Sequence, residues 1–160
     1  MRFELLQQDD TSRLGKLHFL RGEIKTPVFM PVGTYGTVKT MTPYDLESLG
    51  AEIILSNTYH LMIRPGEEVI SSHQGLHQFM AWDRPILTDS GGYQIWSLSK
   101  KRTINDDFVE FDSPVNGDMI RLTPEIAMRI QKTLGSDIQM VLDECTHYPA
   151  TKDEASVSMK

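Results

Sequence analysis

The sequence contains one cysteine and no long apolar run, and each shortage excludes a class of protein. Cys145 has no second cysteine among the 160 residues with which to form a disulfide or a cysteine-rich zinc cluster. No apolar run approaches the ~20 residues of a membrane span. The first ten residues lack the apolar segment of a signal peptide and already carry acidic side chains. We therefore expect a cytoplasmic protein, where thiols stay reduced.

Basic residues are also in short supply. The chain has 16 lysines and arginines against 22 aspartates and glutamates, for a formal net charge of −6. This balance argues against a nucleic-acid-binding surface built from these residues alone, because such surfaces are rich in positive charge. A hydrophobic content of 39% is enough for a core, and the length suits one domain.

The sequence pattern predicts a β-rich start followed by alternating strands and helices. Residues 1–40 are expected to form a β-rich cap, with strands at 2–6 and 15–19 and an extended segment at 24–32. Helices are expected to begin after the capping threonines Thr42, Thr123 and Thr151, and a further short helix at 66–72. The segment 60–65 is expected to be a loop. Asn116 and Gly117 predict a hairpin insertion near 108–122.

Three buried strands are predicted, at 52–57, 86–88 and 137–142, and each is followed by polar residues. The βα order is typical of a parallel sheet or barrel, in which the carboxyl ends of the strands meet at one rim. A complete (β/α)8 barrel needs ~250 residues. We therefore expect residues 41–160 to be the first βα units of a TIM-type barrel within a larger α/β protein.

The most informative motif follows the predicted strand at 86–88 and reads Asp89-Ser90-Gly91-Gly92-Tyr93-Gln94. A carboxylate at the end of a buried strand, next to two glycines, allows a planar ligand to approach the backbone. A purely structural alternative is that Asp89 caps the following helix.

Asp143 ends the next predicted strand, so two carboxylates are expected at one rim. Such a pair can transfer protons or accept hydrogen bonds from the N–H edge of a guanine-like base, on which Tyr93 could stack. The alternatives are that Asp143 caps a helix and that Tyr93 packs in the core. Cys145 is interpreted as a small buried side chain rather than a nucleophile.

Other polar residues carry less information. His60, His73 and His77 do not have the spacing of metal ligands, so no metal site is assigned. Asn57 and His60 are better placed to form hydrogen bonds that orient the ligand-binding groups. The run 100–102, Lys-Lys-Arg, is interpreted as a solvated loop, with phosphate contact as the alternative.

Five motifs together resemble the tRNA-guanine transglycosylases, also called queuine tRNA-ribosyltransferases, and the last of them resembles the bacterial branch. In order they are Thr26-Pro27-Val28-Phe29-Met30-Pro31-Val32-Gly33-Thr34, Ser56-Asn57-Thr58-Tyr59-His60-Leu61, Arg64-Pro65-Gly66, Leu87-Thr88-Asp89-Ser90-Gly91-Gly92-Tyr93-Gln94 and Asp143-Glu144-Cys145-Thr146. The resemblance covers nearly the whole chain. It implies an irregular (β/α)8 barrel preceded by a small antiparallel sheet.

The resemblance also implies an activity and residue roles. The family exchanges guanine at the wobble position of tRNA for a 7-deazaguanine, in bacteria preQ1, through a covalent ribosyl-enzyme intermediate. Asp89 matches the proton-transferring aspartate and Asp143 the base-reading aspartate. Tyr93 matches the stacking tyrosine. Residues 90–92 match the loop beside the base, and Cys145 a cysteine near the pocket.

The family's nucleophilic aspartate, zinc ligands and basic tRNA-docking surface lie in the second half of its sequence, beyond Lys160 here. We therefore expect this chain alone to be inactive, and expect zinc and a homodimer only for the full-length enzyme. Two alternatives remain open: a truncated paralogue that binds a purine or a partner without catalysis, and an unrelated (β/α) enzyme with a carboxylate pair.

Overall fold

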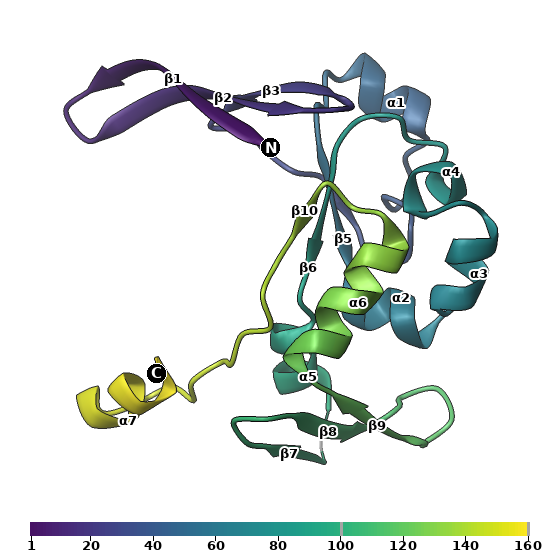
Figure 1. Ribbon diagram of the computed structural model, residues 1–160, viewed down its shortest axis with the longest axis vertical. Helices are drawn as coiled ribbons and strands as arrows, with labels where there is room; N and C mark the ends of the chain where they lie inside the picture. Colours follow the sequence, from purple (N-terminus) through teal and green to yellow (C-terminus); the bar gives the residue numbers. More distant parts are fainter. Residues whose placement is uncertain (100, 160) are drawn as a thin grey trace.

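A parallel four-stranded sheet lies at the centre of the protein (Figure 1). The computed structural model describes residues 1–99 and 101–159. The sheet has the order β10-β6-β5-β4, and every neighbouring pair is parallel. Its strands are β4 (Val32–Gly33), β5 (Ile54–Asn57), β6 (Ile86–Asp89) and β10 (Ile138–Gln139). The predicted α/β class with a parallel sheet is therefore confirmed.

The register of this sheet brings two polar residues together. Asn57, the last residue of β5, is the direct partner of Asp89, the last residue of β6. Parallel strands in register end at the same edge, so the segments that follow β5 and β6 begin side by side. This edge carries the candidate site.

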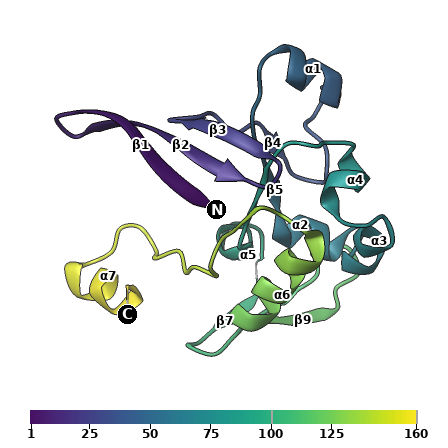
Figure 2. The same ribbon diagram turned by 45° about the horizontal axis from the view of Figure 1, so that its top comes forward.

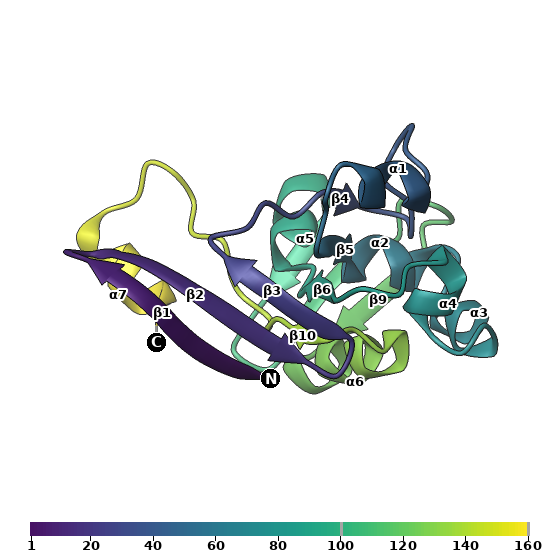
Figure 3. The same ribbon diagram turned by 90° about the horizontal axis from the view of Figure 1, so that it is seen from above.

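A separate antiparallel sheet precedes the central one. It consists of β1 (Arg2–Asp9), β2 (Ser12–Phe19) and β3 (Gly22–Thr26) in sequence order. Figures 1 and 3 show it across the end of the central sheet opposite α5. Arg21 lies in the turn between β2 and β3, and its Nε is 3.8 Å from Oδ1 of Asp137, the residue before β10. The antiparallel sheet therefore lies at the amino ends of the parallel strands, away from the site.

Seven helices occur in the described residues, and most are short. They are α1 (Pro43–Ser48), α2 (Thr58–Ile63), α3 (Glu67–Ser72), α4 (Leu76–Met80), α5 (Gly92–Leu98), α6 (Pro124–Leu134) and α7 (Lys152–Ser158). The side chains of Thr42, Thr123 and Thr151 accept hydrogen bonds from the first turns of α1, α6 and α7, as predicted. In Figure 2, α7 stands apart from the other helices.

The predicted loop at 60–65 is wrong, because α2 covers most of it. This helix has no side-chain cap of its own at Asn57. Instead, the Asp89 carboxylate accepts the Thr58 N–H, and the Asp89 carbonyl accepts the Thr58 hydroxyl. The signal that starts α2 therefore comes from a residue about thirty positions away, which local patterns do not report.

A third sheet lies below the carboxyl edge in Figure 1 and contains β7 (Arg102–Ile104), β8 (Val109–Asp112) and β9 (Met119–Leu122). The predicted hairpin is β8–β9, and Gly117 in its turn has a φ of +78°. Strand β7 was not predicted, because all three of its residues are exposed and lack apolar alternation. Of the basic run, Lys100 lies outside the described residues.

The third parallel strand is shorter and more exposed than predicted. Strand β10 has two residues, and Val141, which was expected to be buried, is 71% exposed. Gln131 of α6 takes both hydrogen-bonding groups of Met140, since its Oε1 accepts the Met140 N–H at 2.9 Å and its Nε2 donates to the Met140 carbonyl at 2.8 Å. The Met140 N–H also donates to the Thr88 carbonyl of β6 at 3.2 Å, so the ladder reaches this residue, and Gln131 adds the bond to its carbonyl.

One hydrophobic core joins the central sheet to the helices. Helix α6 packs against α2 and α3. The fully buried side chains include Tyr59, Trp82, Ile54, Ile86 and Leu134. Burial of such residues at roughly 25 cal/mol per Å² fixes the two central strands, and with them the position of the edge where they end. No helix in the described residues is long and apolar enough to cross a membrane.

Candidate functional site

Asp89 lies at the carboxyl end of β6 and accepts hydrogen bonds from three neighbouring groups. Its Oδ2 accepts from Asn57 Nδ2 at 2.7 Å and from Gln94 Nε2 at 3.2 Å. Its Oδ1 accepts from the Thr58 N–H at 3.2 Å. These donors come from β5, α2 and α5, so the tertiary fold fixes the direction of the carboxylate.

The pKa of Asp89 is raised from 3.8 to about 6, and burial is the largest cause. Hydrogen bonds from Thr58, Gln94 and Gly91 lower this pKa, and the negative charge of Asp143 raises it. A carboxyl group with this pKa can both give and accept a proton near neutral pH. The side chain therefore has the property required of a general acid and base.

The alternative that Asp89 caps the helix that follows it, α5, is wrong. The N-cap of α5 is Gly91, and no side chain caps that helix. Asp89 does accept the first N–H of α2. Asp89 thus contacts the first turns of both α2 and α5, and its carboxylate stays at the edge where β5 and β6 end.

Asp143 is connected to the same edge through Ser90. The Ser90 hydroxyl donates to Asp143 Oδ1 at 2.5 Å and accepts the Gly92 N–H at 3.2 Å. The cap alternative for Asp143 is wrong, because the next helix, α7, is capped by Thr151. The predicted convergence of the two carboxylates is therefore present, with the chain 89–92 between them.

The two glycines allow this convergence. A Cβ atom on Gly92 would collide with the backbone carbonyl and Oδ1 of Asp143. Gly91 has a φ of +91°, and a Cβ there would lie 3.1 Å from Cβ of Tyr59. Only residues without side chains let the 143 segment and α2 approach the turn after β6.

Tyr93 is 57% exposed, so the core-packing alternative for this ring is wrong. It lies on α5 beside Trp96, with ring centroids 5.8 Å apart and planes inclined by 38°. Trp96 in turn lies 6.5 Å from the His147 ring. The tyrosine side chain is therefore largely open to solvent, on the helix that begins at Gly92.

Cys145 is half-buried, and burial followed by the charges of Asp143 and Glu144 raises the pKa of its thiol above 9.0. A thiol of that kind stays protonated at neutral pH, which disfavours a nucleophilic role. Cys145 lines the cavity described next, and its place beside a base pocket stays a prediction.

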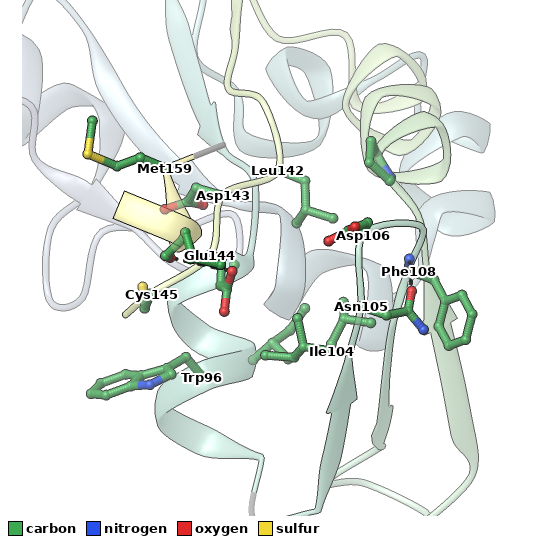
Figure 4. A pocket seen from close by; sticks show the side chains of 16 residues that line it. Trp96, Ile104, Asn105, Asp106, Phe108, Leu142, Asp143, Glu144, Cys145 and Met159 are labelled. Atoms are coloured by element: carbon green, nitrogen blue, oxygen red, sulfur yellow. Dashed lines mark hydrogen bonds between the residues drawn. The ribbon is translucent and has the colours of Figure 1, made fainter. Parts of the chain in front are cut away.

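An open cavity of about 880 Å³ lies between α5, the β7–β8 turn and the segment 142–145. Figure 4 shows Asp143, Glu144 and Cys145 on one side of it and Asn105 and Asp106 on the other. Asp89 does not line this cavity, which reaches the carboxylate edge only through Gly92 and Asp143. The cavity therefore adjoins the carboxylate edge but does not contain Asp89.

Asn57 and His60 form hydrogen bonds that orient Asp89, as the sequence predicted. Asn57 donates to Asp89, and its Oδ1 lies 2.9 Å from His60 Nδ1. Gln94 was assigned no role, although it is the last residue of the motif. Its Nε2 donates to Asp89, and its buried Oε1 has no partner in the described residues. In the basic run at 100–102, Arg102 donates a hydrogen bond to the Ser99 carbonyl.

Across residues 1–99 and 101–159, no group of three or more His, Cys, Asp or Glu side chains is arranged to hold a metal ion. The side chains at the carboxylate edge instead donate to or accept from one another. The residues present at this edge therefore do not fit a zinc site.

Comparisons with known proteins agree on one family. The model of the family described as queuine tRNA-ribosyltransferase matches residues 9–160. Proteins named queuine tRNA-ribosyltransferase from Thioalkalivibrio sulfidiphilus, Thiobacillus denitrificans and Francisella tularensis subsp. novicida are 60%, 58% and 55% identical to this chain over all 160 residues. The chain spans 43%, 44% and 44% of the lengths of these relatives.

Proposed function

This chain belongs to the queuine tRNA-ribosyltransferase family, and on that premise we propose that its carboxylate edge binds a guanine-like base during base exchange in tRNA. The observation that carries the proposal is the pairing of Asp89, whose pKa is about 6, with Asp143 across Ser90 and Gly92. Family membership also removes the alternative of an unrelated (β/α) enzyme.

Base recognition is assigned to Asp143 and Tyr93. A guanine-like base carries adjacent N–H donors on one edge, and a carboxylate accepts two of them side by side. Asp143 is held in place by Ser90, which supports this role. Stacking of a base on the exposed Tyr93 ring contributes roughly 1–3 kcal/mol.

Proton transfer is assigned to Asp89. In the proposed exchange, a nucleophilic carboxylate forms a bond to ribose C1′ while the bond from C1′ to the guanine nitrogen breaks and its electron pair stays on the base. Protonated Asp89 gives its proton to the leaving guanine. The incoming base then returns a proton to Asp89 and attacks C1′, which releases the nucleophile. Asp89 ends each cycle as it began.

The nucleophile is not assigned to any of residues 1–160, because the family resemblance places it later in the sequence. Zinc is likewise expected of the whole enzyme, and no step proposed here runs through it. The parallel order β10-β6-β5-β4 supports the proposal that these strands are the first of a (β/α)8 barrel. A preQ1 substrate, a homodimer and a cytoplasmic location are proposals on the same resemblance.

The test is incorporation of labelled guanine into tRNA by the protein at its natural length, with a parallel calorimetric titration with guanine. The proposal predicts both exchange and binding. Binding without exchange would favour the purine-binding, non-catalytic alternative. Absence of both would contradict the proposal.

A further inference from the structure

A chain of two hydrogen bonds runs from Asp89 through Asn57 to His60. Asn57 Nδ2 donates to Asp89 Oδ2 at 2.7 Å, and Asn57 Oδ1 lies 2.9 Å from His60 Nδ1. The Asn57 side chain is almost completely buried. Both ends of its amide are therefore occupied by protein groups, and the amide cannot turn without changing both partners.

The chemistry of Asp89 and Asn57 determines which nitrogen of His60 carries the proton. An ionised carboxylate only accepts hydrogen bonds, so the Asn57 NH2 must face Asp89 when Asp89 is charged. The Asn57 carbonyl oxygen then faces His60 and can only accept. His60 must consequently carry its proton on Nδ1, which leaves Nε2 without a proton in the neutral ring.

The surroundings of His60 hold the ring in the required position. Tyr35 and Tyr59 contact it edge-on, with ring centroids at 4.9 and 5.2 Å. Desolvation by burial lowers the pKa of His60, which keeps the ring neutral near pH 7. The titratable groups that face the chain of hydrogen bonds are these two tyrosines, Asp89 itself and Asp143, whose charge acts on Asp89.

We propose that His60 is a positioning residue, which donates from Nδ1 to Asn57 and thereby holds the Asn57 amide in the orientation that stabilises ionised Asp89. Without this donor, Asn57 is free to turn and present its carbonyl oxygen to Asp89. A carbonyl oxygen stabilises the protonated carboxyl, which can donate to it, and destabilises the carboxylate. His60 thus sets the proton affinity of Asp89 without touching the base. The functional consequence rests on the proposed exchange activity, but the effect on Asp89 does not.

The experiment follows the titration of Asp89 by carboxyl ¹³C NMR in the protein at its natural length, in His60→Phe and His60→Asn variants. Phe keeps a ring without a donor, whereas the Asn Nδ2 lies where Nδ1 of histidine lies. His60→Phe is expected to move the Asp89 titration up by about one pH unit, a tenfold change in proton affinity. His60→Asn is expected to restore it. His73→Phe, on the exposed end of α3, is the matched control and is expected to leave the titration unchanged.

An unchanged Asp89 titration in His60→Phe would overturn the proposal. Equal shifts in His60→Phe and His60→Asn would also overturn it, since they would assign the effect to ring packing. If His60→Phe does not fold, as judged by thermal melting, His60→Leu provides the same comparison. Exchange assays on these variants are expected to show the acid limb of the pH profile moving with the titration while KM for tRNA stays the same. If the Asp89 titration moves as predicted but the protein has no exchange activity, the proposed function is refuted and this inference still stands.

Discussion

The Ser90 hydroxyl donates to Asp143 Oδ1 at 2.5 Å, which joins residues 53 positions apart in the sequence. The same hydroxyl accepts the Gly92 N–H. Ser90 is almost completely buried, so water does not replace these bonds easily. The position of the base-reading carboxylate therefore depends on the turn that follows Asp89.

Ser90→Ala is expected to weaken guanine binding by about tenfold, because a hydrogen bond to a charged group contributes roughly 1.5–3 kcal/mol. Calorimetric titration with guanine measures the effect. Ser97→Ala, at an exposed position on α5, is the matched control and should bind as the parent protein does. Equal affinities for Ser90→Ala and the parent would show that Asp143 does not need this support.

Asp143→Ala is expected to reduce guanine affinity at least tenfold and to change thermal stability little, since no other side chain in the described residues depends on it except Ser90. Affinity and melting temperature are measured together. Glu144→Ala removes a neighbouring carboxylate that also lines the cavity and is expected to leave affinity unchanged. A variant that melts early but still binds guanine would assign Asp143 to folding.

Gly92→Ala is expected to abolish measurable guanine binding, because the added Cβ would collide with the Asp143 carbonyl and displace the 143 segment. Gly117→Ala in the hairpin turn is the control. Its φ of +78° imposes backbone strain of about 1 kcal/mol, but its Cβ would meet open space. The control should lose stability and keep guanine affinity, whereas loss of stability alone in Gly92→Ala would contradict the expected displacement.

Asp89→Asn is expected to change stability in a pH-dependent way. A carboxyl whose folded pKa, about 6, lies above its unfolded value of 3.8 costs stability once it ionises. The cost is absent below the unfolded value and complete above pH 6. The stability of Asp89→Asn relative to the parent should therefore rise by at most about 3 kcal/mol between pH 3.5 and 7.5. Urea unfolding at the two pH values measures it, and a pH-independent difference would contradict the raised pKa.

Sequence patterns predicted those parts of the fold whose signals are local. Thr42 and Thr123 cap their helices as expected, and the Asn116–Gly117 hairpin forms. Helix α2 and the short β10 were mispredicted because their boundaries depend on distant side chains. Asp89 accepts the first N–H of the helix, and Gln131 donates to the Met140 carbonyl just after the strand.

The candidate site follows the same division. The motif at 89–94 and the chain order pointed to Asp89, Asp143 and Asn57, since strand ends of a parallel sheet meet at one edge. The contact of Gly92 with Asp143 could not be predicted, because it depends on how the segment after β10 lies against α5. The direction of the Gln94 amide could not be predicted either, because it depends on how α5 lies against the end of β6.

The most direct test of the account is guanine exchange by Asp89→Asn in the protein at its natural length, measured as incorporation of labelled guanine into tRNA. Asparagine keeps the size of the side chain and much of its hydrogen bonding, but it cannot transfer the proton. The account predicts that the variant still binds guanine and exchanges it at least about a hundredfold more slowly than the parent protein. Exchange at the parent rate would contradict the assignment of proton transfer to Asp89.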